Sequence, residues 1–299
     1  MNKDVIKRII IENQERIPAL TVFNRNISFD KNANYILTGQ RRAGKTFLLY
    51  SQIQKLISDG RDKNEFLYIN FEDERLLEFR VSDFELLIES YKELFDHVPI
   101  LFFDEIQNIN GWEKFVRRVA DFQYQIFITG SNATMLSREM ASTLGGRFLV
   151  KEIDTLSFEE FLIFNNVLLD KNFAFSDQRF QLTKLFNDWF YQGGFPELLK
   201  YQDKKEYLNT IFQKVFLGDI ISRYHVRNKF ALNLMIKKLA ESTMDEVSFN
   251  RIKNIIQSTG VKVGTTTLIE YFNYLEDSFL LRSTNNFSKK ITERETKKK

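Results

Sequence analysis

The chain has 299 residues, of which 43 are basic and 40 acidic, and its formal net charge is +3. It contains no run of about 18 apolar residues and no signal-peptide core near its N-terminus, so we expect no membrane partner and a cytoplasmic location. The absence of cysteine excludes disulfides, thiolate zinc sites and a cysteine nucleophile.

The first half of the chain alternates strand-like and helix-like segments. Residues 1–30 have the pattern of a helix and a lead-in strand. Five strand-like runs follow, at residues 35–38, 66–70, 99–103, 125–130 and 148–153. This alternation predicts an α/β fold with a parallel sheet and helices on both of its faces. The carboxyl ends of parallel strands gather at one edge, and we expect the functional site there.

The segment after the first strand-like run matches the phosphate-binding loop pattern G-x-x-x-x-G-K-[ST] at every fixed position. The residues expected to bind nucleotide are Gly39, Gln40, Arg41, Arg42, Ala43, Gly44, Lys45, Thr46 and Phe47. In such a loop Lys45 reaches the β- and γ-phosphates and the Thr46 hydroxyl ligates Mg²⁺. The loop precedes a helical pattern, whose N-terminal dipole favours anions.

The third strand-like run ends in two adjacent carboxylates, Asp104 and Glu105. An all-apolar run suits a central parallel strand that is buried on both faces. We expect Asp104 to hold Mg²⁺, directly or through water, and Glu105 to orient or deprotonate the water that attacks the γ-phosphate. The second acid favours ATP hydrolysis over phosphoryl transfer to a metabolite. Found in this order, the two motifs favour a nucleotide site over unrelated loops.

Polar residues follow the fourth strand-like run. Ser131 and Asn132, with Thr129 behind them, are candidates for contacting the γ-phosphate or the attacking water. The structural alternative is an asparagine-containing turn.

Arg147 follows two glycines and precedes the fifth strand-like run. Two glycines before an arginine make the backbone flexible and allow the guanidinium group to reach a ligand. We expect Arg147 to stabilise charge on the γ-phosphate, in its own subunit or a neighbour's, or else to be a surface arginine at a strand start.

Several segments in this order carry a family resemblance: TGQRRAGKTFLL, LYINFED, ILFFDEIQNINGWE, IFITGSN, LGGRF with LSFEEFL, and YQGGFPE. They resemble the predicted AAA-type P-loop ATPases (AAA+ superfamily) of bacteria and archaea that carry a C-terminal domain of unknown function. The resemblance implies an AAA-type core, ATP and Mg²⁺ as cofactors, and a C-terminal winged-helix-like unit, but no particular substrate. Such proteins usually continue into a further α/β region, so we expect a short member or a truncated product.

The strand-like runs nearly vanish after residue 155, which predicts a domain boundary there. We predict four parts: an AAA-type P-loop ATPase domain at 1–155, a helical segment at 156–230, a winged-helix-like unit at 231–288 and a disordered basic tail at 289–299. In the winged-helix-like unit, three helical patterns precede a wing strand at 279–284.

The charge of the winged-helix-like unit argues against direct DNA binding. Residues 231–288 hold six basic and six acidic residues, and the helix in the recognition position carries Glu270, Glu276 and Asp277 but no lysine or arginine. A helix that reads DNA normally needs positive charge against phosphate. DNA binding is therefore not favoured, although the basic tail leaves it open.

Two functional hypotheses from different classes remain. The first is a Mg²⁺-dependent ATPase whose nucleotide state moves its C-terminal part and acts on an unknown protein or nucleic-acid partner, in an oligomer or alone. The alternative is a nucleotide-gated binding or signalling module that hydrolyses ATP slowly. A DNA-binding regulator ranks third.

Overall fold

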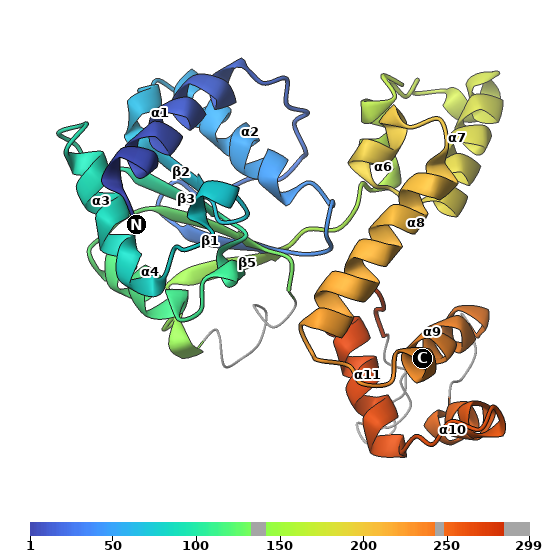
Figure 1. The fold of residues 1–299 in the computed structure, drawn as a ribbon. Coiled ribbons are helices and arrows are strands. Elements are labelled where there is room, and N and C mark those ends of the chain that lie inside the picture. Colours follow the sequence, from blue (N-terminus) through green and yellow to red (C-terminus); the bar gives the residue numbers. More distant parts are fainter. Residues whose placement is uncertain (133–141, 243–247, 284–299) are drawn as a thin grey trace. The chain divides into compact units, whose positions relative to one another are not determined.

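The computed structural model describes residues 1–132, 142–242 and 248–283. The chain divides into two compact units, Met1–Lys205 and Glu206–Lys299 (Figure 1). The predicted boundary near residue 155 thus lies within the first unit, and the division into four parts stays a prediction. Within the described residues, no helix has the length and apolar character needed to cross a membrane.

A five-stranded parallel sheet forms the centre of the first unit. Its strands are β1 (Asn34–Thr38), β2 (Phe66–Asn70), β3 (Ile100–Asp104), β4 (Ile126–Gly130) and β5 (Phe148–Glu152). Their order across the sheet is β2-β3-β4-β1-β5. Each strand lies within one residue of its predicted ends, so the α/β prediction is confirmed. Because all neighbours are parallel, the segments that follow the strands meet at one edge.

Helices cover both faces of this sheet (Figure 1). They are α1 (Lys3–Ala19), α2 (Lys45–Ser58), α3 (Phe84–Lys92) and α4 (Trp112–Asp121). Two further helices, α6 (Phe158–Phe164) and α7 (Gln178–Gln192), follow the last strand. The predicted lead-in strand is wrong, because residues 20–33 form no strand. Their backbone bonds are local instead: Ile27 N donates to the Arg25 carbonyl, and Asp30 N donates to the Tyr35 hydroxyl.

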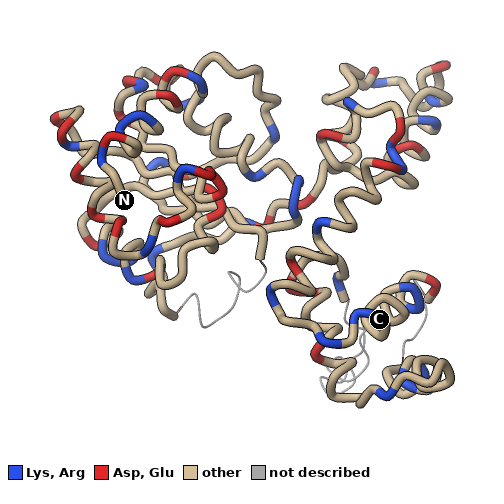
Figure 2. The backbone as a smooth tube through the Cα atoms, viewed as in Figure 1, with Lys and Arg blue, Asp and Glu red and all other residues tan. Residues whose placement is uncertain are grey.

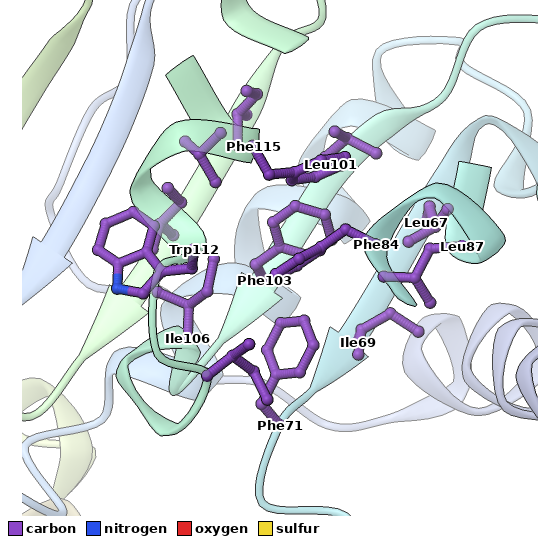
Figure 3. Close-up of a cluster of buried hydrophobic side chains, with 14 of the residues drawn as sticks. Leu67, Ile69, Phe71, Phe84, Leu87, Leu101, Phe103, Ile106, Trp112 and Phe115 are labelled. Carbon is purple, nitrogen blue, oxygen red and sulfur yellow. The ribbon is translucent and has the colours of Figure 1, made fainter. Parts of the chain in front are cut away.

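Two apolar clusters fill the space between sheet and helices, one on each face. Alternate residues of one strand point to opposite faces, so Phe103 lies in the cluster shown in Figure 3 and Phe102 in the other. Phe103 packs near Phe84 and Phe115, whereas Phe102 stacks on Phe127 with ring centroids 4.9 Å apart. Burying one such side chain contributes about 1.5–3 kcal/mol. The many phenylalanines therefore make a rigid base for the strand ends.

The second unit is helical within its described residues. From α8 (Lys204–Lys214) the chain continues through a π-helix (Val215–Ser222) to α9 (Lys229–Glu241), α10 (Phe249–Ser258) and α11 (Thr265–Asp277). The last three helices pack on one another around buried Leu232, Ile256 and Leu268.

The predicted wing of this unit is not confirmed. The described residues 279–283 form no strand, because Leu280 N and Leu281 N both bond back to the Leu275 carbonyl and so end α11. Thr284 and the predicted basic tail lie outside the described residues.

Candidate functional site

The order of the strands brings the predicted site segments together. In the sheet, β4 lies between β1 and β3. The loop that follows β1, the carboxylates at the end of β3 and the polar residues after β4 are therefore neighbours at the carboxyl-terminal edge. A crevice at this edge is where open α/β sheets bind ligands.

Lys45 is the first residue of α2 and is buried, with 4% of its surface exposed. Its Nζ donates to the carbonyls of Gly39 (2.9 Å) and Gln40 (3.0 Å) and lies 4.0 Å from Oε1 of Glu105. Gly39 has a φ of +148°, and a methyl group built on it would lie 2.1 Å from the Ile153 carbonyl oxygen. Only glycine fits there, so the chain after β5 fixes the start of the loop.

The other loop residues make specific contacts. Arg41 pairs with Glu72 at 3.0 Å, and Arg42 pairs with Glu197. Ala43 is fully buried, and its carbonyl accepts a hydrogen bond from Arg25 at 2.9 Å. Phe47, 42% exposed, packs edge-on against Tyr50. Both loop arginines are thus held by carboxylates from distant parts of the chain, which the motif alone does not reveal.

Asp104 is fully buried at the end of β3. Its Oδ1 accepts a hydrogen bond from the Thr129 hydroxyl and its Oδ2 accepts one from the Tyr68 hydroxyl at 2.8 Å. The Thr46 side chain also acts on this carboxylate and lowers its pKa. Burial, and next the charge of Glu105, raise the pKa of Asp104 to about 6, although these hydrogen bonds act in the opposite direction.

The oxygen donors around Asp104 fit Mg²⁺. This ion is usually held by one or two carboxylates together with substrate phosphates. The Thr46 hydroxyl acts on the Asp104 carboxylate, and the two groups would supply the protein's part of such a set. Within the described residues, no cluster of three or more His, Cys, Asp or Glu side chains could hold a metal by itself.

Glu105 lies beside Asp104 in a left-handed backbone conformation, with a φ of +53°. Its N–H donates to the Thr129 hydroxyl at 2.9 Å, and its carboxylate accepts a hydrogen bond from the Gln107 side-chain amide. The same amide lies 3.3 Å from Oγ of Ser131. Ile106, between Glu105 and Gln107, points into the apolar cluster and so anchors this turn (Figure 3). Gln107 therefore connects Glu105 and Ser131, two of the residues predicted to be catalytic.

The polar residues after β4 lie at the same edge. Ser131 is buried and contacts Gln107. Asn132 contributes its backbone carbonyl, which accepts a hydrogen bond from the Thr38 hydroxyl at 3.0 Å. The structure thus brings Ser131 to Glu105 and connects Asn132 to the end of β1.

Arg147 lies at the opposite edge of the sheet. It directly precedes β5, its guanidinium pairs with Asp121, and its carbonyl accepts a hydrogen bond from the Asn34 side chain at the start of β1. A strand of five residues spans about 16 Å. The geometry gives no support to a role of Arg147 at the phosphate loop of its own subunit, and a role at a neighbour's loop stays a prediction.

Comparison with known proteins identifies the domain that carries this arrangement. Residues 31–162 match the family model described as an AAA domain, and residues 183–299 match a domain of unknown function, DUF8612. The chain contains an AAA domain. It holds the phosphate loop, Asp104, Glu105, Ser131 and Arg147.

Two relatives align with this chain over most of its length. An uncharacterised protein of Methanocaldococcus jannaschii is 35% identical over 293 residues, which are 96% of this chain and 65% of that protein. An uncharacterised protein of Haemophilus influenzae is 32% identical over 252 residues, which are 82% of this chain and 60% of that protein. The chain therefore spans less than two thirds of the length of these relatives.

Solved structures give weaker likenesses. AMPPCP-bound DnaA from Aquifex aeolicus is 14% identical with a TM-score of 0.35, covering 93% of this chain and 89% of that chain. The ORC1 protein of Aeropyrum pernix, solved in complex with DNA, is 12% identical with a TM-score of 0.40, covering 96% and 86%. Because these likenesses are weak, the domain is defined by its sheet order and by the family match.

A cavity of about 290 Å³ lies beside α2, the helix that follows the phosphate loop. Arg25 lies in its wall and donates to the Ala43 carbonyl of the loop. The other walls are the segment 24–29, one side of α2, and Glu160, Ile163 and Phe164 of α6. This volume is near the lower limit of small-molecule pockets, about 300 Å³. Neither Arg25 nor this cavity was predicted, because both depend on how α6 packs.

Replacing Asp104 with asparagine is expected to stabilise the nucleotide-free protein at neutral pH. The pKa of Asp104 rises on folding from 3.8 to about 6, so the native state binds this proton more tightly. The associated stability is full below pH 3.8 and is lost as the pH rises to about 6. At pH 7.5 the Asp104→Asn variant should therefore gain up to about 3 kcal/mol in unfolding free energy.

Urea unfolding of both proteins at pH 5 and pH 7.5 tests this prediction. We expect the advantage of the variant to be larger at pH 7.5. A variant that is less stable than the wild type at both pH values would contradict the assignment of a buried charge.

Proposed function

We propose that the AAA domain binds ATP with Mg²⁺ and hydrolyses it. The observation that carries the proposal is the convergence of the buried Asp104–Thr129–Tyr68 network and Glu105 on a phosphate-binding loop. Acidic residues beside such a loop suit hydrolysis, because one carboxylate can hold the metal while the other acts on water.

Each residue has a defined part in this proposal. The backbone N–H groups of the loop and the Lys45 ammonium bind the phosphates. Thr46 and Asp104 would hold Mg²⁺, which when bound neutralises charge on the β- and γ-phosphates. Glu105 orients the attacking water and accepts its proton. Gln107 fixes the Glu105 carboxylate through its amide, with Ser131 at the far side of that amide.

The cavity beside α2 is the proposed place of the purine base. It is polar at Arg25 and Glu160, apolar at Ile163 and Phe164, and lies next to the helix that would bind the phosphates. No guanine-reading motif of the N-K-x-D kind is evident in the sequence, so ATP is the expected nucleotide.

Phosphate release by the purified chain tests the proposal. We expect steady release from ATP with Mg²⁺ and a fall to background when EDTA removes the metal. Nucleotide binding without release would favour the alternative, a nucleotide-gated binding or signalling module. An absence of ATP binding would contradict both.

Arg147 is proposed to act on the nucleotide of a neighbouring subunit. If it does, Arg147→Ala and Lys45→Ala proteins should each be nearly inactive, and their mixture should regain about a quarter or more of the wild-type rate, because mixed interfaces combine an intact loop with an intact arginine. Steady-state hydrolysis of the mixture measures this. A mixture no faster than its parts, or an active Arg147→Ala protein, would make Arg147 a structural residue that pairs with Asp121.

The second unit is proposed to transmit the nucleotide state to a protein or nucleic-acid partner. In this unit α11 carries acidic residues and no lysine or arginine (Figure 2). A partner that requires a basic recognition helix is therefore not favoured, and direct DNA binding ranks below a protein partner. A strong salt dependence of DNA affinity would reverse that order.

A further inference from the structure

We propose that Glu197 is a positioning residue that holds Arg42 of the phosphate loop, and that nucleotide phosphate competes with Glu197 for Arg42. The inference rests on the proposed ATP site and adds a residue from outside the phosphate-loop and acidic motifs. It concerns the YQGGFPE segment (residues 191–197), one of the segments that carry the family resemblance.

The YQGGFPE segment lies directly against the phosphate loop. The Glu197 carboxylate pairs with the Arg42 guanidinium. One residue earlier, Pro196 packs on the loop: a methyl group built on Gly44 would lie 3.6 Å from Cγ of Pro196. Two consecutive residues of the segment thus contact the part of the loop that would surround the phosphates.

A set of hydrogen bonds fixes this segment. The Leu156 N–H donates to the Gly194 carbonyl at 2.7 Å, and the Trp189 indole donates to the Leu156 carbonyl at 2.8 Å. Gly194 approaches so closely that a methyl group built on it would lie 2.3 Å from the Leu156 carbonyl oxygen. Glu197 therefore belongs to a segment whose position is fixed by backbone contacts with Leu156.

Arg25 connects the phosphate loop to the residues on either side of Leu156. It is 8% exposed and forms a two-pronged ion pair with Glu160 of α6, at 2.7 and 2.8 Å. Its Nη1 also donates to the carbonyls of Ala43 (2.9 Å) and Asp154 (3.0 Å). The loop and the segment that carries Glu197 are thus held to each other at a buried point, while the Arg42–Glu197 pair forms a second, outer connection.

The outer connection is suited to exchange. The side chains of Arg42 and Glu197 are 37% and 36% exposed, and an ion pair with that much exposure contributes little stability. A phosphate group carries more negative charge than a carboxylate and accepts the same bidentate hydrogen bonds from a guanidinium, which makes the stronger bond. Nucleotide phosphate should therefore take Arg42 from Glu197.

The effect of this exchange can pass along the backbone toward the second unit. Glu197 lies in the short helix η7 (Pro196–Lys200), which precedes α8 (Lys204–Lys214) by only three residues. Release of Glu197 frees η7 from the loop, so the nucleotide state reaches the start of α8 along the backbone. This route gives Glu197 a function in both nucleotide affinity and its coupling.

Competition and simple support make opposite predictions. If Glu197 merely supported the loop, removing its charge would weaken nucleotide binding or leave it unchanged. If Glu197 competes with phosphate, the Glu197→Gln variant must bind ATP more tightly. The effect must also require Arg42, because Arg42 is the group for which the two anions compete.

A double-mutant cycle on the full chain provides the test. ATP dissociation constants are measured for the wild type, Glu197→Gln, Arg42→Gln and the double variant, with Glu197→Asp as the variant that keeps the charge. We expect Glu197→Gln to tighten binding by about two- to fivefold, the upper value corresponding to about 1 kcal/mol. Glu197→Asp should remain near the wild type, and the tightening should vanish in the Arg42→Gln background.

Two results would overturn the inference alone: Glu197→Gln binds ATP no more tightly than the wild type, or it tightens binding equally without Arg42. The proposed ATP site itself fails in a different way, namely when the wild type binds no ATP, and the inference then fails with it. Comparing circular dichroism spectra of all variants confirms that each one is folded.

Discussion

The Lys45→Ala protein is expected to lose ATP binding, with a dissociation constant raised by about 100-fold or more. Lys45 is buried at the N-terminus of α2, and its ammonium reaches the loop carbonyls and approaches Glu105. In the proposed complex this ammonium bonds to the phosphates instead. A charged hydrogen bond contributes about 1.5–3 kcal/mol, so losing two of them gives a change of this size.

Titration with a fluorescent ATP analogue measures the effect, and Lys92→Ala is the matched control. Lys92 ends α3 and is exposed on the surface. Because removing a buried lysine can also alter folding, the melting temperature of each variant is compared with that of the wild type. A folded Lys45→Ala protein with wild-type affinity would contradict the assignment of the phosphate loop.

The Glu105→Gln protein should bind ATP as the wild type does and hydrolyse it about 100- to 10,000-fold more slowly. This range is the usual contribution of a positioned general base. Glutamine has the shape of glutamate and still offers an oxygen to the Gln107 amide, so the site should stay intact. What it lacks is the negative charge that orients the water and accepts its proton.

Steady-state phosphate release at saturating ATP measures this loss, with Glu113→Gln as the control. Glu113 lies in the first turn of α4, where its charge favours the helix N-terminus. Equal turnover in wild type and Glu105→Gln would remove Glu105 from the mechanism and move attention to another base.

Much of this site could be predicted because the relevant signals are local. Apolar runs bounded by polar residues defined the five strands, and parallel strands place the residues that follow them at one edge. That rule places Lys45, Asp104, Glu105 and Ser131 together from the sequence alone. The same rule applies to Arg147: because it precedes β5, parallel topology alone places it at the far edge from the loop.

The contacts that could not be predicted join residues far apart in the chain. Tyr68 donates to Asp104 because β2 and β3 are neighbours, and neither residue signals the other in sequence. Arg25 reaches Ala43 and Glu160 only once α6 has packed against the loop. These contacts depend on sheet order and helix docking, which periodicity does not specify.

The predicted wing illustrates a different limit of sequence patterns. Residues 279–283 include Phe279, Leu280 and Leu281, and an apolar run this short suits either a strand or the end of a helix. The backbone resolved the choice, since Phe279 adopts a φ of +57° and the two leucines bond back to Leu275. Such a helix ending is a property of local hydrogen bonds, and apolar content does not report it.

The nucleotide that remains bound after incubation with Mg²⁺ and ATP tests the central claim most directly. Wild type and Glu105→Gln are each incubated, freed of unbound nucleotide and denatured, and the released nucleotide is identified by chromatography. We predict ADP from the wild type and ATP from Glu105→Gln. Intact ATP from both proteins would contradict the hydrolase and leave a nucleotide-gated binding module.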